Sequence, residues 1–99
     1  MFDPLIQLGR KTVVAMVHVP ALPGSPDYEH TGGMNKLLHS VVADLEALQS
    51  GGVDAIMFGN EFDRPYVLKA PPEGLAALAS VIGQVKSMIK VPFGGNYLW

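Results

Sequence analysis

Four polar residues lie at or just beyond the ends of short apolar segments, and their types suit acid–base or metal chemistry. His18 follows the first segment, and Asn60 and Glu61 follow the second. Asn96 lies in the third. A neutral imidazole titrates near neutral pH and binds divalent metals, so His18 is predicted to be a catalytic base or a metal ligand. Glu61 is predicted to be a catalytic acid or base or a metal-binding carboxylate, and Asn60 and Asn96 are predicted to bind substrate.

Each of these residues also has a purely structural interpretation. His18 could be hydrogen-bonded to a loop backbone, and Asn60 with Glu61 could cap a helix or brace a turn, because asparagine commonly stabilises turns. Asn96 is unusual in a buried strand, since its amide must be satisfied by hydrogen bonds. A divalent metal is possible with these ligands, and the sequence does not identify a cofactor.

The segments that carry these residues are predicted to alternate between strands and helices. The first segment is largely apolar and β-branched, which is typical of a strand buried in a parallel sheet. The helices are predicted from apolar side chains at helical spacing, from two glycines after the first helix, and from prolines at the start of the second. The predicted elements are a strand at 11–17, a helix at 34–49, a strand at 53–58, a helix that begins at 71–73 and ends before residue 92, and a strand at 93–99. The second helix is predicted to bury Leu75, Leu78, Ala79, Ile82, Val85 and Ile89.

This order predicts an α/β fold with a parallel βαβαβ arrangement. The pattern alone allows a doubly wound sheet or the start of a (β/α)₈ barrel. Long polar loops follow the first two strands and short plain turns follow the helices, which favours a barrel whose active face lies at the carboxyl ends of the strands. No Gly-x-Gly-x-x-Gly motif follows the first strand, which weakens the alternative of a dinucleotide-binding fold. In a barrel, the four polar residues would surround one opening.

Other polar residues are assigned away from this opening. Asp54 begins the second strand and is predicted to serve stability at the opposite face of the barrel. Asp63 and Arg64 could clamp a phosphate or a sugar, but a solvated pair in a loop is the preferred interpretation. His30 and His39 are predicted to be surface residues. A nucleoside triphosphatase is disfavoured because no Gly-Lys-Ser/Thr motif is present.

Composition narrows the functional classes. The chain has 99 residues, of which 48% are hydrophobic and 16% are charged, as expected for one globular domain or part of one. A net charge of −2 without a basic stripe argues against nucleic-acid binding. The absence of cysteine, of a signal-peptide pattern and of an apolar stretch of about 20 residues predicts a cytoplasmic protein with no transmembrane segment.

Three segments of the chain resemble the BtpA/SgcQ family. They read MVHVPALPGSP at 16–26, LQSGGVDAIMFGNEF at 48–62 and VPFGGN at 91–96, and they follow one another in the family's order along nearly the whole chain. The resemblance implies a (β/α)₈ TIM barrel, which typically needs about 250 residues. Residues 1–99 are therefore expected to form the N-terminal part of a single barrel domain, with only its first three strands.

The resemblance leaves several functions open. Its sugar-utilisation members imply an isomerase, lyase or hydrolase of a small polar metabolite such as a sugar or sugar phosphate, with acid–base or metal-assisted catalysis. Its photosystem-linked members imply instead a non-catalytic biogenesis factor for a membrane complex of the photosystem I type. An inactive fragment is the third alternative. A small-molecule substrate is the expected partner, and exposed sheet edges predict self-association if the chain is only a fragment.

Overall fold

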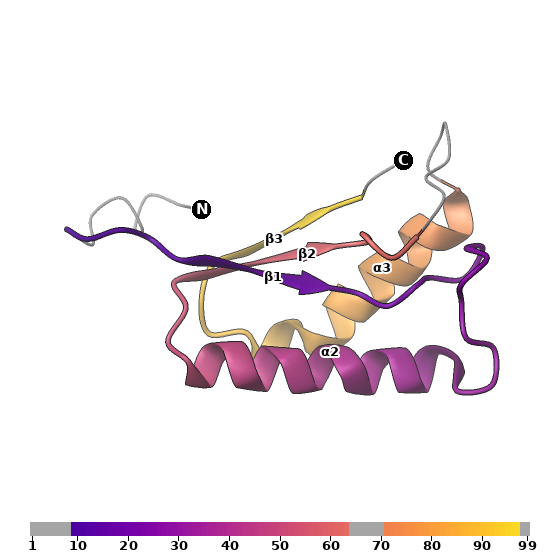
Figure 1. The fold of residues 1–99 in the computed structure, drawn as a ribbon, viewed down its shortest axis with the longest axis horizontal. Coiled ribbons are helices and arrows are strands. Elements are labelled where there is room, and N and C mark those ends of the chain that lie inside the picture. The colour runs from indigo at the N-terminus through magenta and orange to yellow at the C-terminus, as the bar shows by residue number, and fades with distance from the viewer. Residues whose placement is uncertain (1–8, 64–70, 98–99) are drawn as a thin grey trace.

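The computed structural model describes residues 9–63 and 71–97. Its elements follow the predicted βαβαβ order, which is thereby confirmed (Figure 1). They are β1 at Val14–His18, α2 at Gly33–Ser50, β2 at Ala55–Gly59, α3 at Pro72–Val85, the short 3₁₀ helix η1 at Lys86–Met88, and β3 at Phe93–Asn96.

The three strands form one parallel sheet in the order β1-β2-β3. Both long helices lie on the same face of this sheet: in Figure 1, α2 runs below the strands, and α3 slopes from the level of the strand ends down toward α2. Sequential strand order with every crossover helix on one face is the arrangement of the first three strands of a (β/α)₈ barrel. In a closed barrel, the face without helices would be the inner one.

The hydrophobic core lies between the sheet and the two helices. Val17 of β1 and Ile56 and Phe58 of β2 are completely buried there, and the ring of Phe58 packs edge-on against Phe93 of β3 at a centroid distance of 6.3 Å. The helices contribute residues at helical spacing to the same core. These are Leu37, Val41 and Leu45 of α2 and Ala77, Leu78, Val81 and Val85 of α3.

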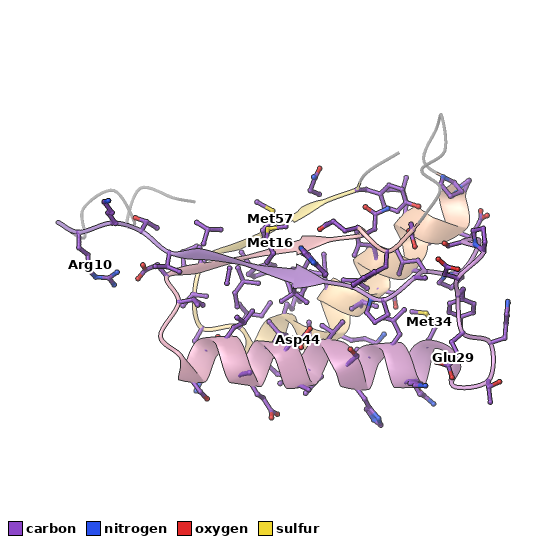
Figure 2. All side chains as sticks on the ribbon, viewed as in Figure 1. Arg10, Met16, Glu29, Met34, Asp44 and Met57 are labelled. Carbon is purple, nitrogen blue, oxygen red and sulfur yellow. The ribbon has the colours of Figure 1, made fainter. Side chains whose placement is uncertain are left out.

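The other face of the sheet is open. Val14 and Met16 are 47% and 44% exposed, and Met57 lies opposite Met16 on the neighbouring strand. Figure 2 shows Met16 and Met57 on the side of the sheet away from α2. The alternation of side chains along a strand thus sends one set into the helix-covered core and the other to this uncovered face.

Local sequence explains where the helices begin and end. Pro72 stands at the first turn of α3, where a missing N–H costs no hydrogen bond. After α2, Gly52 adopts a φ of 81° and its N–H bonds to the carbonyl of Gln49 at 3.1 Å. A left-handed glycine after a helix is a common stop signal, as the sequence predicted. In the described part of the chain, neither helix has the length and hydrophobicity needed to cross a bilayer.

Several predicted details are wrong. The first strand begins at Val14 instead of residue 11 and includes His18, because its ladder starts only where β2 lies alongside it. The third strand ends at Asn96, and residues 98–99 of the predicted strand lie outside the described residues. On α3, Leu75 is 45% exposed and Ala79 is also exposed, because the face turned to the sheet is shifted around the helix axis. The buried set is Gly74, Ala77, Leu78, Val81 and Val85.

Candidate functional site

The carboxyl ends of the three strands meet in one row. His18 ends β1, Gly59 ends β2 and Asn96 ends β3. The register places His18 opposite Gly59 and Gly59 opposite Asn96. Residues opposite one another in a parallel sheet point to the same face, which here is the face without helices. The structure therefore places His18 and Asn96 on one side of the sheet, separated by a residue that has no side chain.

Glu61 uses the space that Gly59 leaves. A Cβ atom on Gly59 would overlap the Glu61 carboxyl group, whose Oε2 and Cδ atoms lie 2.8 and 2.9 Å from that position. In this place Glu61 Oε2 is 3.1 Å from His18 Nε2. The His18 side chain is 48% exposed and the Glu61 side chain 22%. An imidazole and a carboxyl group within hydrogen-bonding distance, with the imidazole open to solvent, can together move a proton to or from a bound molecule.

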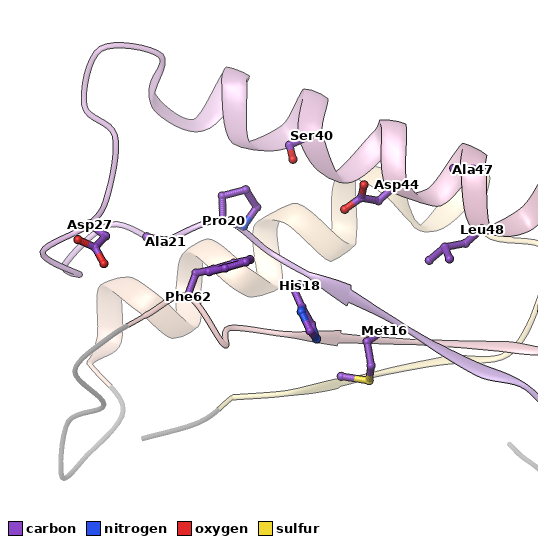
Figure 3. A pocket seen from close by; sticks show the side chains of 10 residues that line it. All are labelled: Met16, His18, Pro20, Ala21, Asp27, Ser40, Asp44, Ala47, Leu48 and Phe62. Atoms are coloured by element: carbon purple, nitrogen blue, oxygen red, sulfur yellow. The ribbon is translucent and has the colours of Figure 1, made fainter.

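A groove of about 690 Å³ runs beside His18, along the edge of β1 that faces away from β2 (Figure 3). The exposed ring of Phe62 also lines the groove and meets the His18 ring edge-on, with centroids 6.1 Å apart. The helix side of the groove carries Asp44. Its described lining consists of Met16, His18, Pro20, Ala21, Asp27, Ser40, Asp44, Ala47, Leu48 and Phe62, with two acidic residues and no lysine or arginine.

Asn60 is not brought to this row. Its side chain is completely buried, and its Nδ2 donates to Asp63 Oδ2 at 3.1 Å. The Asp63 carboxyl group also accepts the N–H of Leu22, at 2.7 Å. Asp63 is only 8% exposed, so the predicted solvated pair with Arg64 is wrong for Asp63, and Arg64 lies outside the described residues. Substrate binding by Asn60 stays a prediction, while its contacts in the structure are with the protein.

Tyr97, which is partly buried, adjoins Asn60 and Asp63. Its hydroxyl is hydrogen-bonded with Asp63 and Asn60. Burial raises the pKa of Tyr97, and the nearby negative charges of Asp63 and Glu73 raise it further. Residues from the loops after all three strands therefore meet on the helix side of the sheet, close to the row that holds His18 and Asn96.

The sequence did not predict that Gly59, Asp63 and Tyr97 contribute to the structure of the site. A glycine between a buried strand and a polar pair was a signal for the first, since glycine in a strand often marks close approach of another group. The spacing Asn60-x-x-Asp63 was a weak signal for a turn. Nothing in the sequence linked Tyr97 to either residue.

The remaining polar residues are distributed as follows. Asp54 lies at the amino end of β2, away from the row, where it binds Arg10 through two contacts of 2.8 and 2.5 Å and the N–H of Val13 at 2.8 Å. These contacts lower the pKa of Asp54, the Arg10 hydrogen bond most strongly. His30 and His39 are exposed.

A metal ion would need more ligands than this site offers. Within residues 9–63 and 71–97, no three His, Cys, Asp or Glu side chains are grouped so as to hold a metal. His18 and Glu61 could supply two ligands to a divalent ion. The others would have to come from Asn96, water or groups beyond the described residues.

Comparison with known proteins identifies a family. The model of the BtpA family matches residues 9–99. The putative sgc region protein SgcQ of Escherichia coli (strain K12) is 53% identical over 89 residues, which make up 90% of this chain and 33% of that protein. The uncharacterized protein PH1209 of Pyrococcus horikoshii is 34% identical over 93 residues, 94% of this chain and 35% of that protein.

Similarity also extends to a eukaryote. The uncharacterized protein F13E9.13, mitochondrial, of Caenorhabditis elegans is 35% identical over 82 residues, 82% of this chain and 29% of that protein. The chain thus spans about a third of the length of the curated relatives it matches. No solved structure matches it.

Proposed function

Because the chain belongs to the BtpA family, we propose that it supplies the N-terminal three strands of a single (β/α)₈ barrel domain, that of a cytoplasmic enzyme acting on a small polar metabolite such as a sugar or sugar phosphate. In this proposal His18 and Glu61 transfer protons in an isomerase, lyase or hydrolase reaction. Asn96 orients the substrate from the third strand.

The observation that carries this proposal is the contact between His18 Nε2 and Glu61 Oε2 at 3.1 Å. The two residues come from the ends of different strands, at the end of the sheet where (β/α)₈ enzymes place their catalytic groups. Gly59 supports the same interpretation, because its missing side chain is what allows the Glu61 carboxyl group to approach the imidazole. A ligand above the sheet would meet the exposed imidazole first.

The two side chains of the pair are suited to different chemical roles. The imidazole is about half exposed and can exchange a proton with a ligand, whereas Glu61 is more covered and contacts the ring nitrogen. A carboxylate in that place holds the ring in one orientation and stabilises the charged ring that forms when it takes up a proton. The Asn96 amide can both donate and accept hydrogen bonds, which suits hydroxyl or carbonyl groups of a substrate.

The test uses the full-length E. coli relative, because it contains the whole barrel-length chain. Phosphorylated and unphosphorylated aldoses and ketoses are screened for turnover, with and without Mg²⁺ or Mn²⁺. Substitution by glutamine at the positions that align with His18 and Glu61 should lower kcat by roughly 10²–10⁴-fold, the usual contribution of a general acid or base. Glutamine at the position that aligns with His39, on the outer surface of α2, is the control. Unchanged turnover in both site variants would exclude the assigned roles.

We also propose that the isolated chain associates with itself through its sheet edges. Among the described residues, β1 and β3 are each paired along one edge, to β2, and the apolar face with Val14 and Met16 is exposed. Open strand edges next to exposed apolar side chains favour pairing with another chain. Light scattering should show a mass above 10.6 kDa that grows with concentration, and Val14→Lys should reduce it. A wild-type chain that stays monomeric and melts cooperatively would contradict this.

A further inference from the structure

The turn that carries Glu61 is closed by Asp63. The N–H of Asp63 donates to the carbonyl of Asn60 at 2.9 Å, and Asn60 Nδ2 donates back to Asp63 Oδ2 at 3.1 Å. Glu61 and Phe62 are the two residues between them. Two hydrogen bonds across so short a turn fix the direction in which the Glu61 side chain leaves the backbone.

The same carboxyl group reaches the loop after β1. Asp63 Oδ1 accepts the N–H of Leu22 at 2.7 Å, across 41 positions of sequence. Leu22 is completely buried and lies four residues after His18, so its position is fixed by the core. Asp63 therefore joins the loop that follows His18 to the turn that holds Glu61.

The third strand is joined at the same point. Tyr97 directly follows Asn96, and its hydroxyl is hydrogen-bonded with Asp63 and Asn60. The Asp63 carboxyl group thus lies among groups from all three strand ends while it is only 8% exposed. Burial of a carboxyl group is costly unless hydrogen bonds replace its water, and here the replacements come from the neighbours of the site residues.

We propose that Asp63 is the positioning residue of the site: it does not touch the ligand, and it holds the Glu61 carboxyl group against His18. This inference rests on the proposed function of the His18–Glu61 pair. A displacement of about 1 Å can lower the rate of an oriented reaction by about 10²-fold, so a residue that fixes the turn acts on catalysis through geometry.

The experiment monitors the contact between His18 and Glu61 directly and needs no substrate. The 99-residue chain carrying Val14→Lys, which should reduce its self-association, is labelled with ¹⁵N-histidine, and all variants below are made in this background. The Nε2 signal of His18, assigned with His18→Gln, is recorded in long-range ¹H–¹⁵N spectra. Glu61→Gln should shift this signal by weakening the contact. Asp63→Ala should shift it in the same direction and by a similar amount, and Asp63→Asn, which keeps an acceptor for the Leu22 N–H, should shift it less.

Gln49→Ala is the matched control. Gln49 also makes two hydrogen bonds between distant segments, to the Met88 carbonyl at 3.0 Å and from the Lys90 N–H at 2.7 Å, but at the far end of the sheet. This variant should leave the His18 signal in place. If Asp63→Ala does not fold, as judged by its amide spectrum, Asp63→Asn takes its place, and its smaller shift must have the direction of the Glu61→Gln shift and exceed that of Gln49→Ala.

The outcomes separate the two proposals. A His18 signal that moves in Glu61→Gln and stays in a folded Asp63 variant would overturn the positioning role and leave the catalytic pair intact. A signal that moves equally in Gln49→Ala would also overturn it, since general destabilisation would then be the cause. A signal that does not respond to Glu61→Gln would overturn the pair itself.

Discussion

Replacing Gly59 with alanine is expected to dismantle the candidate site while leaving the fold intact. The added Cβ would occupy the place of the Glu61 carboxyl group, which must then swing away from His18. The backbone itself should tolerate alanine, because Gly59 is not among the described glycines with positive φ. The clash is therefore with the end of a flexible side chain, which can move.

The expected change in stability is small. Alanine in a strand is favoured over glycine by about 0.5–1 kcal/mol, because glycine loses more backbone entropy on folding. The loss of the His18–Glu61 contact, in which the imidazole is 48% exposed, lowers the free energy of unfolding and opposes this gain. Even a fully charged exposed pair contributes only about 0.2–1 kcal/mol, so this is the upper limit of the loss. The two effects have opposite signs, so the free energy of unfolding should change by less than about 1 kcal/mol.

Gly94→Ala provides the control on the same face of the next strand. A Cβ at Gly94 would lie 3.5 Å from the Sδ and Cε atoms of Met57, an ordinary contact distance. Urea unfolding and the His18 Nε2 signal are measured for both variants. Gly59→Ala should keep its unfolding midpoint and shift the His18 signal as Glu61→Gln does. Gly94→Ala should raise its unfolding midpoint slightly, by the general preference for alanine over glycine in a strand, and leave the His18 signal unchanged. A Gly59→Ala chain with the wild-type His18 signal would refute the placement of Glu61 above Gly59.

Three further predictions concern stability. The Arg10 hydrogen bond lowers the pKa of Asp54, so this carboxyl group stabilises the fold above the usual carboxyl pKa of about 4 and loses that contribution as pH falls toward the lowered value. In urea titrations at several pH values, Asp54→Asn should therefore remove this loss of stability in acid. Phe58→Ala should cost about 3–5 kcal/mol in urea unfolding, since Phe58 is completely buried, and a cost below 1 kcal/mol would contradict its core position. Because burial raises the pKa of Tyr97, its contribution to the free energy of unfolding is complete below the ordinary tyrosine pKa of about 10 and declines as pH rises above it. In the same urea assay Tyr97→Phe should abolish this decline at alkaline pH, and an unchanged decline would exclude Tyr97 as its source.

The order of elements could be predicted because it depends on local sequence. The first helix was predicted at residues 34–49 and lies at Gly33–Ser50, since apolar spacing and Gly52 both act within the segment itself. The strands were predicted less accurately. A strand begins where a neighbour offers hydrogen bonds, and the partner of Val14 is Ala55, far away in sequence.

The arrangement of the site was harder to predict, because it too depends on residues far apart in sequence. Asn60 and Glu61 are adjacent and were assigned to one opening, but Asn60 is buried on the helix side while Glu61 reaches His18. A step of one residue along an extended chain reverses the side on which a side chain lies. Composition cannot reveal which of two polar neighbours faces the core. The burial of Asp63 likewise depends on Leu22, 41 positions away.

The Arg10–Asp54 ion pair fastens the end of the sheet opposite His18, and Figure 2 shows Arg10 at that far end. Arg10 is 55% exposed, so added salt should weaken its attraction to Asp54. The end of the sheet beside the site is held instead by the buried hydrogen bonds of Asp63, which dissolved ions screen far less. Ionic strength should therefore weaken the anchoring of the sheet at the Arg10 end while leaving the buried hydrogen bonds of Asp63 at the other end largely unchanged.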